Sequence, residues 1–318
     1  IKDPRHLGRK VMQELVRFGA PEDILWAAHP HIGTFKLVKV VEGLREGIEQ
    51  LGGEIRFNQQ VVDIDIETHK GIRQIRTLTV QDLPTGLGHT LAVRHVVMAL
   101  GHSARDTFTM LHRHGVAMQA KPFSIGVRIE HPQSLIDRAR WGRHAGHPLL
   151  GAADYKLVHH AKNGRAVYSF CMCPGGTVVA ATSEPGRVVT NGMSQYSRNE
   201  RNANSALVVT IERQDLEPWA RFPGDPLAGI AFQRHWERLA FEAGGGDYSA
   251  PAQWVDDFLQ ADSGRGAADA APLASGGLSP DGPDGGEGTI LKVRGSYLPG
   301  LRFTDLDPAL PDYVCASL

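Results

Sequence analysis

The residues best suited to meet a ligand follow a short apolar run and comprise Gly101, His102 and Ser103. The run itself, residues 96–100, is typical of a strand buried on both faces. Gly101 has no Cβ, so backbone there can approach a ligand closely, and Ser103 or Asp106 can cap a following helix. Open α/β sheets bind ligands where a strand ends before a new helix. A tight strand-to-helix turn without a ligand explains these residues equally well.

Two cysteines separated by one residue, Cys171 and Cys173, precede a Pro-Gly-Gly turn. A redox pair is one interpretation, although a single intervening residue on a strand gives a strained bridge. A metal site completed by histidines such as His31 or His159 is another, but no Cys-x-x-Cys partner exists. Packing of both thiols as small apolar groups is the third. The third interpretation is favoured.

Acid–base chemistry has its most compact candidate in Asp154, Tyr155 and Lys156. Arg128, Lys156 and Arg165 could hold an acidic substrate, although isolated cations are more often solvated. A serine hydrolase is not indicated, because no Gly-x-Ser-x-Gly turn is present. A nucleic-acid partner is not indicated either, because no basic stretch interleaved with aromatic residues occurs.

Composition limits the class of protein further. The chain has 318 residues and a formal net charge of −1. This charge balance indicates neither nucleic acid nor a membrane surface as a partner. It contains no signal peptide and no apolar run long enough to cross a bilayer. Three cysteines are too few for a disulfide scaffold. We therefore expect a reducing, cytoplasmic setting.

The chain ends suggest an interior piece of a longer protein. The sequence begins with Ile1 and not with Met. Asp312 is typical of the start of a helix, but only six residues follow it. The glycine pairs Gly86-x-Gly88 and Gly264-x-Gly266 both fail the Gly-x-Gly-x-x-Gly phosphate-loop pattern at the third position. We expect the phosphate-binding half of any dinucleotide site to lie outside this chain.

Periodicity predicts the elements that position these residues. A helix over residues 34–51, ended by Gly52-Gly53, carries an apolar face worth about 1.5–3 kcal/mol per buried side chain, so it must dock on a large surface. That face comprises Leu37, Val41, Leu44, Ile48 and Leu51. Helices are also predicted in 4–28, after residue 103, and over 132–140, 227–243 and 252–259. Strands are predicted at 54–57, 61–66, 72–80, 91–100, 123–130, 155–159, 166–171, 177–182, 187–193 and 205–211.

The order of these elements predicts two kinds of domain. A helix, a meander and a buried strand ending in glycine form the second half of a dinucleotide-binding domain. The regularly spaced short strands from residue 121 onward indicate an inserted mixed or antiparallel sheet. Residues 261–288, rich in Gly, Ala, Pro, Ser and Asp, are predicted to be a disordered loop.

Several blocks of the sequence resemble a bacterial family of uncharacterised FAD-dependent dehydrogenases in the glutathione reductase-like FAD/NAD(P)-binding superfamily. The resemblance is carried by long blocks in the family's order and spans nearly the whole chain. The blocks are 31–34, 101–107, 121–132, 151–156, 168–176, 191–194, 202–206 and 225–230.

The resemblance implies a fold of class α/β with α+β. A partial doubly wound FAD-binding domain (1–118, resumed at 298–318) would be interrupted by a substrate domain (119–297). It also implies an FAD-dependent oxidoreductase, lacking here its glycine-rich loop and a flavin-closing segment, with a small-molecule substrate and an electron acceptor or donor as partners. The alternative is a non-catalytic fragment or binding module that does not hold FAD by itself.

The resemblance also assigns roles to individual residues. Val61 would meet adenine through its backbone. Ala99, Gly101, His102 and Ser103 would lie near the pyrophosphate or ribose. His31, Gly33 and Thr34 would approach the isoalloxazine, where the helix that starts near Thr34 offers free N–H groups. The alternative for His31 is a loop histidine that caps neighbouring backbone. The resemblance names no catalytic residue; the candidates are His31 and the acid–base group Asp154, Tyr155 and Lys156 described above.

Overall fold

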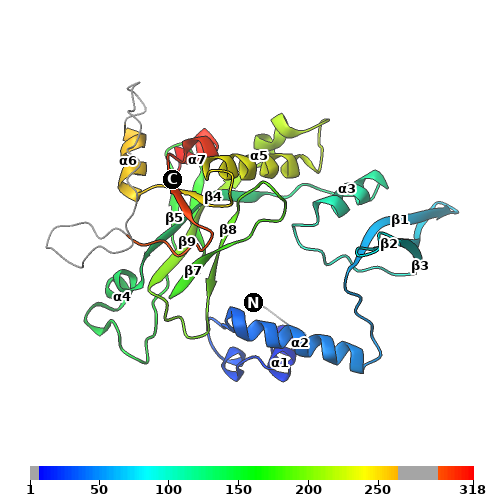
Figure 1. Ribbon diagram of the computed structural model, residues 1–318, viewed down its shortest axis with the longest axis horizontal. Coiled ribbons are helices and arrows are strands. Elements are labelled where there is room, and N and C mark those ends of the chain that lie inside the picture. The colour runs from blue at the N-terminus through cyan, green and yellow to red at the C-terminus, as the bar shows by residue number, and fades with distance from the viewer. Residues whose placement is uncertain (1–6, 264–292) are drawn as a thin grey trace. The chain divides into compact units, whose positions relative to one another are not determined.

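The computed structural model describes residues 7–263 and 293–318, which form two compact units (Figure 1). The larger unit is built from the described parts of residues 1–41, 122–212 and 234–318. The smaller unit is built from residues 42–121 and 213–233. Each unit is described by itself.

A four-stranded antiparallel sheet forms the centre of the larger unit, in the order β4-β9-β6-β5. Its two longest strands pair over their whole length, from Phe123 opposite Ile211 to Pro132 opposite Asn202. Val209 and Ile211 are fully buried, as the alternation of apolar residues predicts for one face of such a strand. The strands are β4 (Phe123–Pro132), β9 (Asn202–Ile211), β6 (Ala166–Cys173) and β5 (Val158–His160).

A hairpin of β7 (Gly176–Ala180) and β8 (Thr190–Ser194) belongs to the same unit. Val178 packs in a buried cluster with Val188 and Tyr297, next to the short parallel pair β10–β11. The remaining strands and α-helices with residues in this unit are β10 (Ala250–Ala252), β11 (Leu301–Phe303), α1 (Leu7–Arg17), α2 (Thr34–Gln50), α4 (Gln133–Trp141), α5 (Ala228–Ala243), α6 (Val255–Ser263) and α7 (Asp312–Cys315).

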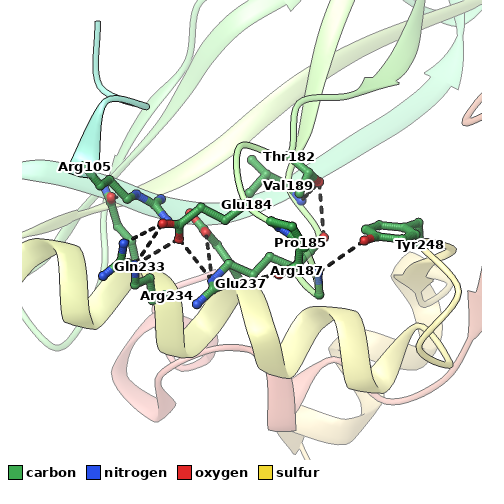
Figure 2. Close-up of polar contacts among 11 residues, drawn as sticks. Arg105, Thr182, Glu184, Pro185, Arg187, Val189, Gln233, Arg234, Glu237 and Tyr248 are labelled. Atoms are coloured by element: carbon green, nitrogen blue, oxygen red, sulfur yellow. Dashed lines mark hydrogen bonds and ion pairs between the residues drawn. The ribbon is translucent and has the colours of Figure 1, made fainter. Parts of the chain in front are cut away.

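An ion-pair cluster fastens the loop between β7 and β8 to α5 (Figure 2). Arg234 donates from Nε and Nη2 to both carboxylate oxygens of Glu184, at 2.9 and 2.5 Å. Arg187 lies 3.4 Å from Glu184 and 4.0 Å from Glu237. Because these side chains are mostly shielded from water, the pairing is screened less than a surface salt bridge.

The smaller unit is an antiparallel meander covered by a helix. Strands β1 (Gln59–His69), β2 (Ile72–Asp82) and β3 (Gly88–Ala92) pair in sequence order, and α3 (Arg105–Arg113) packs on them. Asp63 accepts hydrogen bonds from Arg113 and His114, so β1 is tied to the end of the helix and the pKa of that carboxyl is lowered. The buried core of the smaller unit comprises Ile64, Leu78, Val80, Met110 and Leu111.

The doubly wound half of the predicted fold class is not present in the described residues. They contain antiparallel sheets and the short β10–β11 pair, and no parallel sheet of the Rossmann type. The mixed and antiparallel part of the prediction is confirmed. The fold that the chain shows is therefore a mixed α+β arrangement of small sheets.

Two predicted strands are wrong. Residues 54–57 and 96–100 are irregular, and Val97 is 90 % exposed where a strand buried on both faces was expected. A central strand needs hydrogen-bonding neighbours on both sides, and no described strand lies beside either segment. The helix expected after residue 103 is present as α3, but its N-cap is Ala104, with no side-chain cap from Ser103 or Asp106.

The predicted helix α2 is confirmed, but its predicted docking face is not covered. Val40 is its one buried residue. Val41 and Ile48 are about half exposed, and Leu51, in the turn that follows the helix, is 90 % exposed. An apolar stripe of this kind normally packs against a partner surface.

Three other predictions concern the chain as a whole. Most of the predicted loop 261–288 lies outside the described residues, and residues 261–263 form the end of α6. The boundaries 1–118, 119–297 and 298–318 stay a prediction. Among the helices of the described ranges, none combines the length and apolar character that a membrane span requires.

Candidate functional site

A cavity of about 420 Å³ in the larger unit gathers three segments that are distant in the sequence. The first is the loop before α2, the second is the end of β6 and the third is the end of β8. The residues around the cavity are 30–34, Leu37, 171–174, 192–194 and Arg198. The structure therefore brings His31, Gly33 and Thr34 together with the Cys171–Cys173 segment.

The loop before α2 is held against the end of β8 by polar contacts. The ring Nε2 of His31 lies 2.9 Å from the carbonyl oxygen of Gln195. Thr34 donates from Oγ1 to the carbonyl of Ser194 at 3.4 Å. These contacts join residues about 160 positions apart and make the loop one wall of the cavity.

Gly33 is required here by two independent features of its backbone. Its φ of +82° is a conformation that favours glycine. A Cβ at this position would also lie 2.4 Å from the backbone nitrogen of Tyr196. Close packing of the loop against β8 is therefore possible because residue 33 has no side chain.

The amino end of α2 opens onto the cavity, since Gly33, Thr34 and Leu37 line it. Leu37 donates its backbone N–H to the carbonyl of Gly33 at 3.0 Å, which is the first bond of the helix. The N–H groups of residues 34–36 precede that bond and have no acceptor within the helix. The site therefore presents backbone donors and the positive end of the helix dipole.

The two cysteines on the opposite wall differ in their surroundings. Cys171 is exposed and has a positive φ of +46°, whereas Cys173 is buried. Burial, together with the neighbouring Cys171, raises the pKa of the Cys173 thiol to about 11. Cys173 donates to the Cys171 carbonyl at 3.3 Å, and the two thiols are free. This geometry favours packing for Cys173 over a reactive thiolate.

A metal site involving these cysteines has no support in the described structure. Among residues 7–263 and 293–318, no three His, Cys, Asp or Glu side chains are grouped closely enough to hold an ion. His159 is exposed on β5. His31 is already in contact with a backbone carbonyl.

The predicted acid–base group is divided among separate partners. Asp154 lies 3.7 Å from Nδ1 of His29, and Lys156 is exposed. Tyr155 pairs instead with His131, whose Nε2 lies 2.9 Å from the phenol oxygen. Burial raises the pKa of Tyr155 and lowers that of His131, so both groups are neutral near neutral pH. The three residues do not form one catalytic cluster.

The remaining predicted FAD contacts lie in the smaller unit. Val61 is in β1, opposite Val80 and next to a β-bulge, and packs against the core. Residues 99–103, which contain Ala99, Gly101, His102 and Ser103, form an exposed irregular segment before α3. Gly101 has a φ of +71° and open space around it. These residues are not brought together with His31 within one unit.

Arg198 and Gly192 are cavity residues that the sequence did not single out. Arg198 follows β8 in a turn with a φ of +50°, and Gly192 lies within β8. A Cβ on Gly192 would lie 2.2 Å from Nη1 of Arg128 and 2.7 Å from the Cys173 sulfur. The resemblance of residues 191–194 to a family block was the one signal that pointed to this wall.

Two comparisons with known proteins bear on this site. A family model described as "FAD-dependent protein, C-terminal domain-like" matches residues 122–280. An uncharacterized protein of Clostridium beijerinckii (strain ATCC 51743 / NCIMB 8052) is 43 % identical over 319 residues. The match covers 100 % of this chain and 52 % of that relative, so the chain spans about half the length of the relative.

Proposed function

Because the chain belongs to the FAD-dependent protein, C-terminal domain-like family, we propose that it is part of an FAD-dependent oxidoreductase. The observation that carries the proposal is the cavity that joins the loop before α2 to the family-matched β6 and β8 segments. Under this proposal the flavin ring meets His31, Gly33 and Thr34. The substrate lies against the wall formed by residues 171–174 and 192–194.

The residues around the cavity suit a flavin ring. The amino end of α2 supplies N–H donors and a positive dipole end, which stabilise the electron-rich oxygen and nitrogen edge of a reduced flavin. No Asp or Glu is among the residues that line the cavity. The close packing of Gly33 on Tyr196 fixes the position of these donors.

Bound FAD would supply the two-electron chemistry, since protein side chains cannot carry a hydride themselves. This chain's contribution would be positioning. The contact between His31 and the Gln195 carbonyl orients the imidazole, and the β6 and β8 segments would hold the substrate against the flavin. A small-molecule substrate and an electron acceptor or donor complete the proposal.

The smaller unit supports a larger parent protein. The segment 96–100 exposes Val97, Met98 and Leu100 without any described neighbouring strand. We propose that the complete protein pairs this segment in the parallel sheet of an FAD-binding domain, with Val61 and residues 99–103 near the adenosine and pyrophosphate. The free cysteines agree with a reducing, cytoplasmic location.

A visible absorption spectrum of the purified full-length protein tests the proposal. We expect flavin bands at one FAD per chain. We also expect weaker FAD retention in H31Q than in H159Q, because His159 is an exposed histidine of β5 outside the cavity lining. A full-length protein that is colourless and does not bind added FAD would support the alternative of a non-catalytic binding module.

A further inference from the structure

The cavity beside His31 has an arginine whose guanidinium is unpaired. Arg198 lines the cavity, and its Nε is buried without a hydrogen-bond partner. Within the described ranges its side chain has neither a hydrogen bond nor an ion pair. The positive φ of +50° shows that the turn holds this residue in an uncommon backbone conformation for a side-chain-bearing residue.

Two further donors, Arg128 and Asn204, lie behind the cavity wall at Gly192. Arg128 donates to the side-chain oxygens of Asn204 and Asn191, at 2.5 and 3.4 Å, and to the Cys171 carbonyl at 3.3 Å. All three acceptors are neutral, and no carboxylate of the described residues lies within ion-pair distance of Arg128. Asn204 is fully buried, and its Nδ2 has no partner.

Gly192 separates these donors from the cavity. It lines the cavity, and a Cβ there would lie 2.2 Å from the Arg128 guanidinium and 2.4 Å from the Asn204 oxygen. At this position only the backbone of Gly192 lies between the cavity and the Arg128 guanidinium. The positive charge of Arg128 acts on the cavity through it.

Among the residues that line the cavity, the one buried side-chain atom without a hydrogen-bond partner is a donor, Nε of Arg198. A buried donor without an acceptor costs about 1–3 kcal/mol, and Arg198 Nε and Asn204 Nδ2 are both in this state. No acidic side chain lines the cavity, so a ligand bound there can supply the acceptor that Arg198 lacks. An arginine fork matches the two oxygens of a carboxylate.

We infer that this cavity binds a substrate that carries a carboxylate, with Arg198 as its direct binding residue and Arg128 as electrostatic support. The inference rests on the proposed function, because it names the substrate class of the same site. Arg165 and Lys156, the other cations considered for an acidic substrate, do not take part. Arg165 stacks on Tyr313 and donates to the Thr210 carbonyl.

The test is calorimetric titration of the full-length protein with succinate and benzoate, and with succinamide and benzamide as neutral counterparts. We expect at least one carboxylate to bind and its amide to bind at least about tenfold more weakly, as for other charge-assisted hydrogen bonds. R198M should weaken carboxylate binding by about tenfold or more, and R198K by less. R140M is the matched control, because Arg140 is exposed and lies outside the cavity lining.

FAD content, read from the visible spectrum, separates this inference from the proposed function. FAD retained equally by the wild type and R198M, with carboxylate binding lost in R198M, supports both. Retained FAD without carboxylate binding, or with binding that R198M leaves unchanged, overturns the inference alone. Carboxylate binding that depends on Arg198 in a protein without FAD supports the inference and refutes the flavin proposal.

Discussion

Replacing Gly33 with alanine tests the packing on which the candidate site depends. The new Cβ would lie 2.4 Å from the Tyr196 nitrogen and 2.8 Å from its Cα, so either the loop or the end of β8 must move. A φ of +82° adds about 1–2 kcal/mol for a non-glycine residue. Relief of the overlap adds about 1–3 kcal/mol. We expect a total loss of about 2–5 kcal/mol in unfolding free energy.

A second glycine separates these two contributions. Gly146 belongs to the same unit and has the same φ of +82°, but a Cβ there would meet open space. G146A therefore carries only the backbone cost. Urea unfolding of both variants, followed by tryptophan fluorescence, should place G33A at least about 1 kcal/mol below G146A. Equal stability of the two variants would refute the close approach of the loop to Tyr196.

Three further predictions concern groups away from that contact. Burial lowers the pKa of His131 from its ordinary value of 6.5, so the unfolded chain takes up the proton first as the pH falls. The free energy of unfolding therefore decreases below pH 6.5, by no more than about 1.4 kcal/mol per pH unit. H131N should flatten that slope. Iodoacetamide should label exposed Cys171 at least about 100-fold faster than buried Cys173, because a pKa of about 11 leaves little thiolate. E184Q should cost about 1–2 kcal/mol by weakening the bidentate pair with Arg234.

Each of these predictions has its own contrary result. An unchanged pH slope in H131N would show that the pKa of His131 is not lowered in the folded protein. Mass spectrometry that finds both cysteines labelled at one rate would remove the packing role of Cys173. For the ion pair, E184Q and R234M combined should be less destabilising than their sum by about 0.5 kcal/mol or more. Strict additivity would mean that the two side chains act separately.

Local patterns predicted the elements whose causes are local. Strand β4 and helices α2 and α5 were predicted from apolar periodicity and from the Gly and Pro residues that flank them. Both signals lie in or next to the segment itself. The run at 96–100 shows the limit of this reasoning. Its apolar residues indicate a demand for burial, but a strand also needs neighbours, and the neighbours are not encoded in the run itself.

The candidate site was predicted in part, for a similar reason. His31, Gly33 and Thr34 came from the family resemblance, and the structure places them in one cavity. The sequence around Arg198 contains no pattern that marks it as a site residue, because its proposed role depends on the absence of a hydrogen-bond acceptor in the folded structure. The pairing of Tyr155 with His131 joins the loop before β5 to β4, which no spacing rule along the chain describes.

The contact between His31 and Gln195 also determines when the cavity can form during synthesis of the chain. The two residues are 164 positions apart, and at about 5–20 residues per second a ribosome needs roughly 10–30 s to make the intervening chain. For that time the loop before α2 lacks its contact with the segment that follows β8. The cavity is therefore completed late in translation, and a nascent chain halted before β8 would contain the helix without the opposite wall of its cavity.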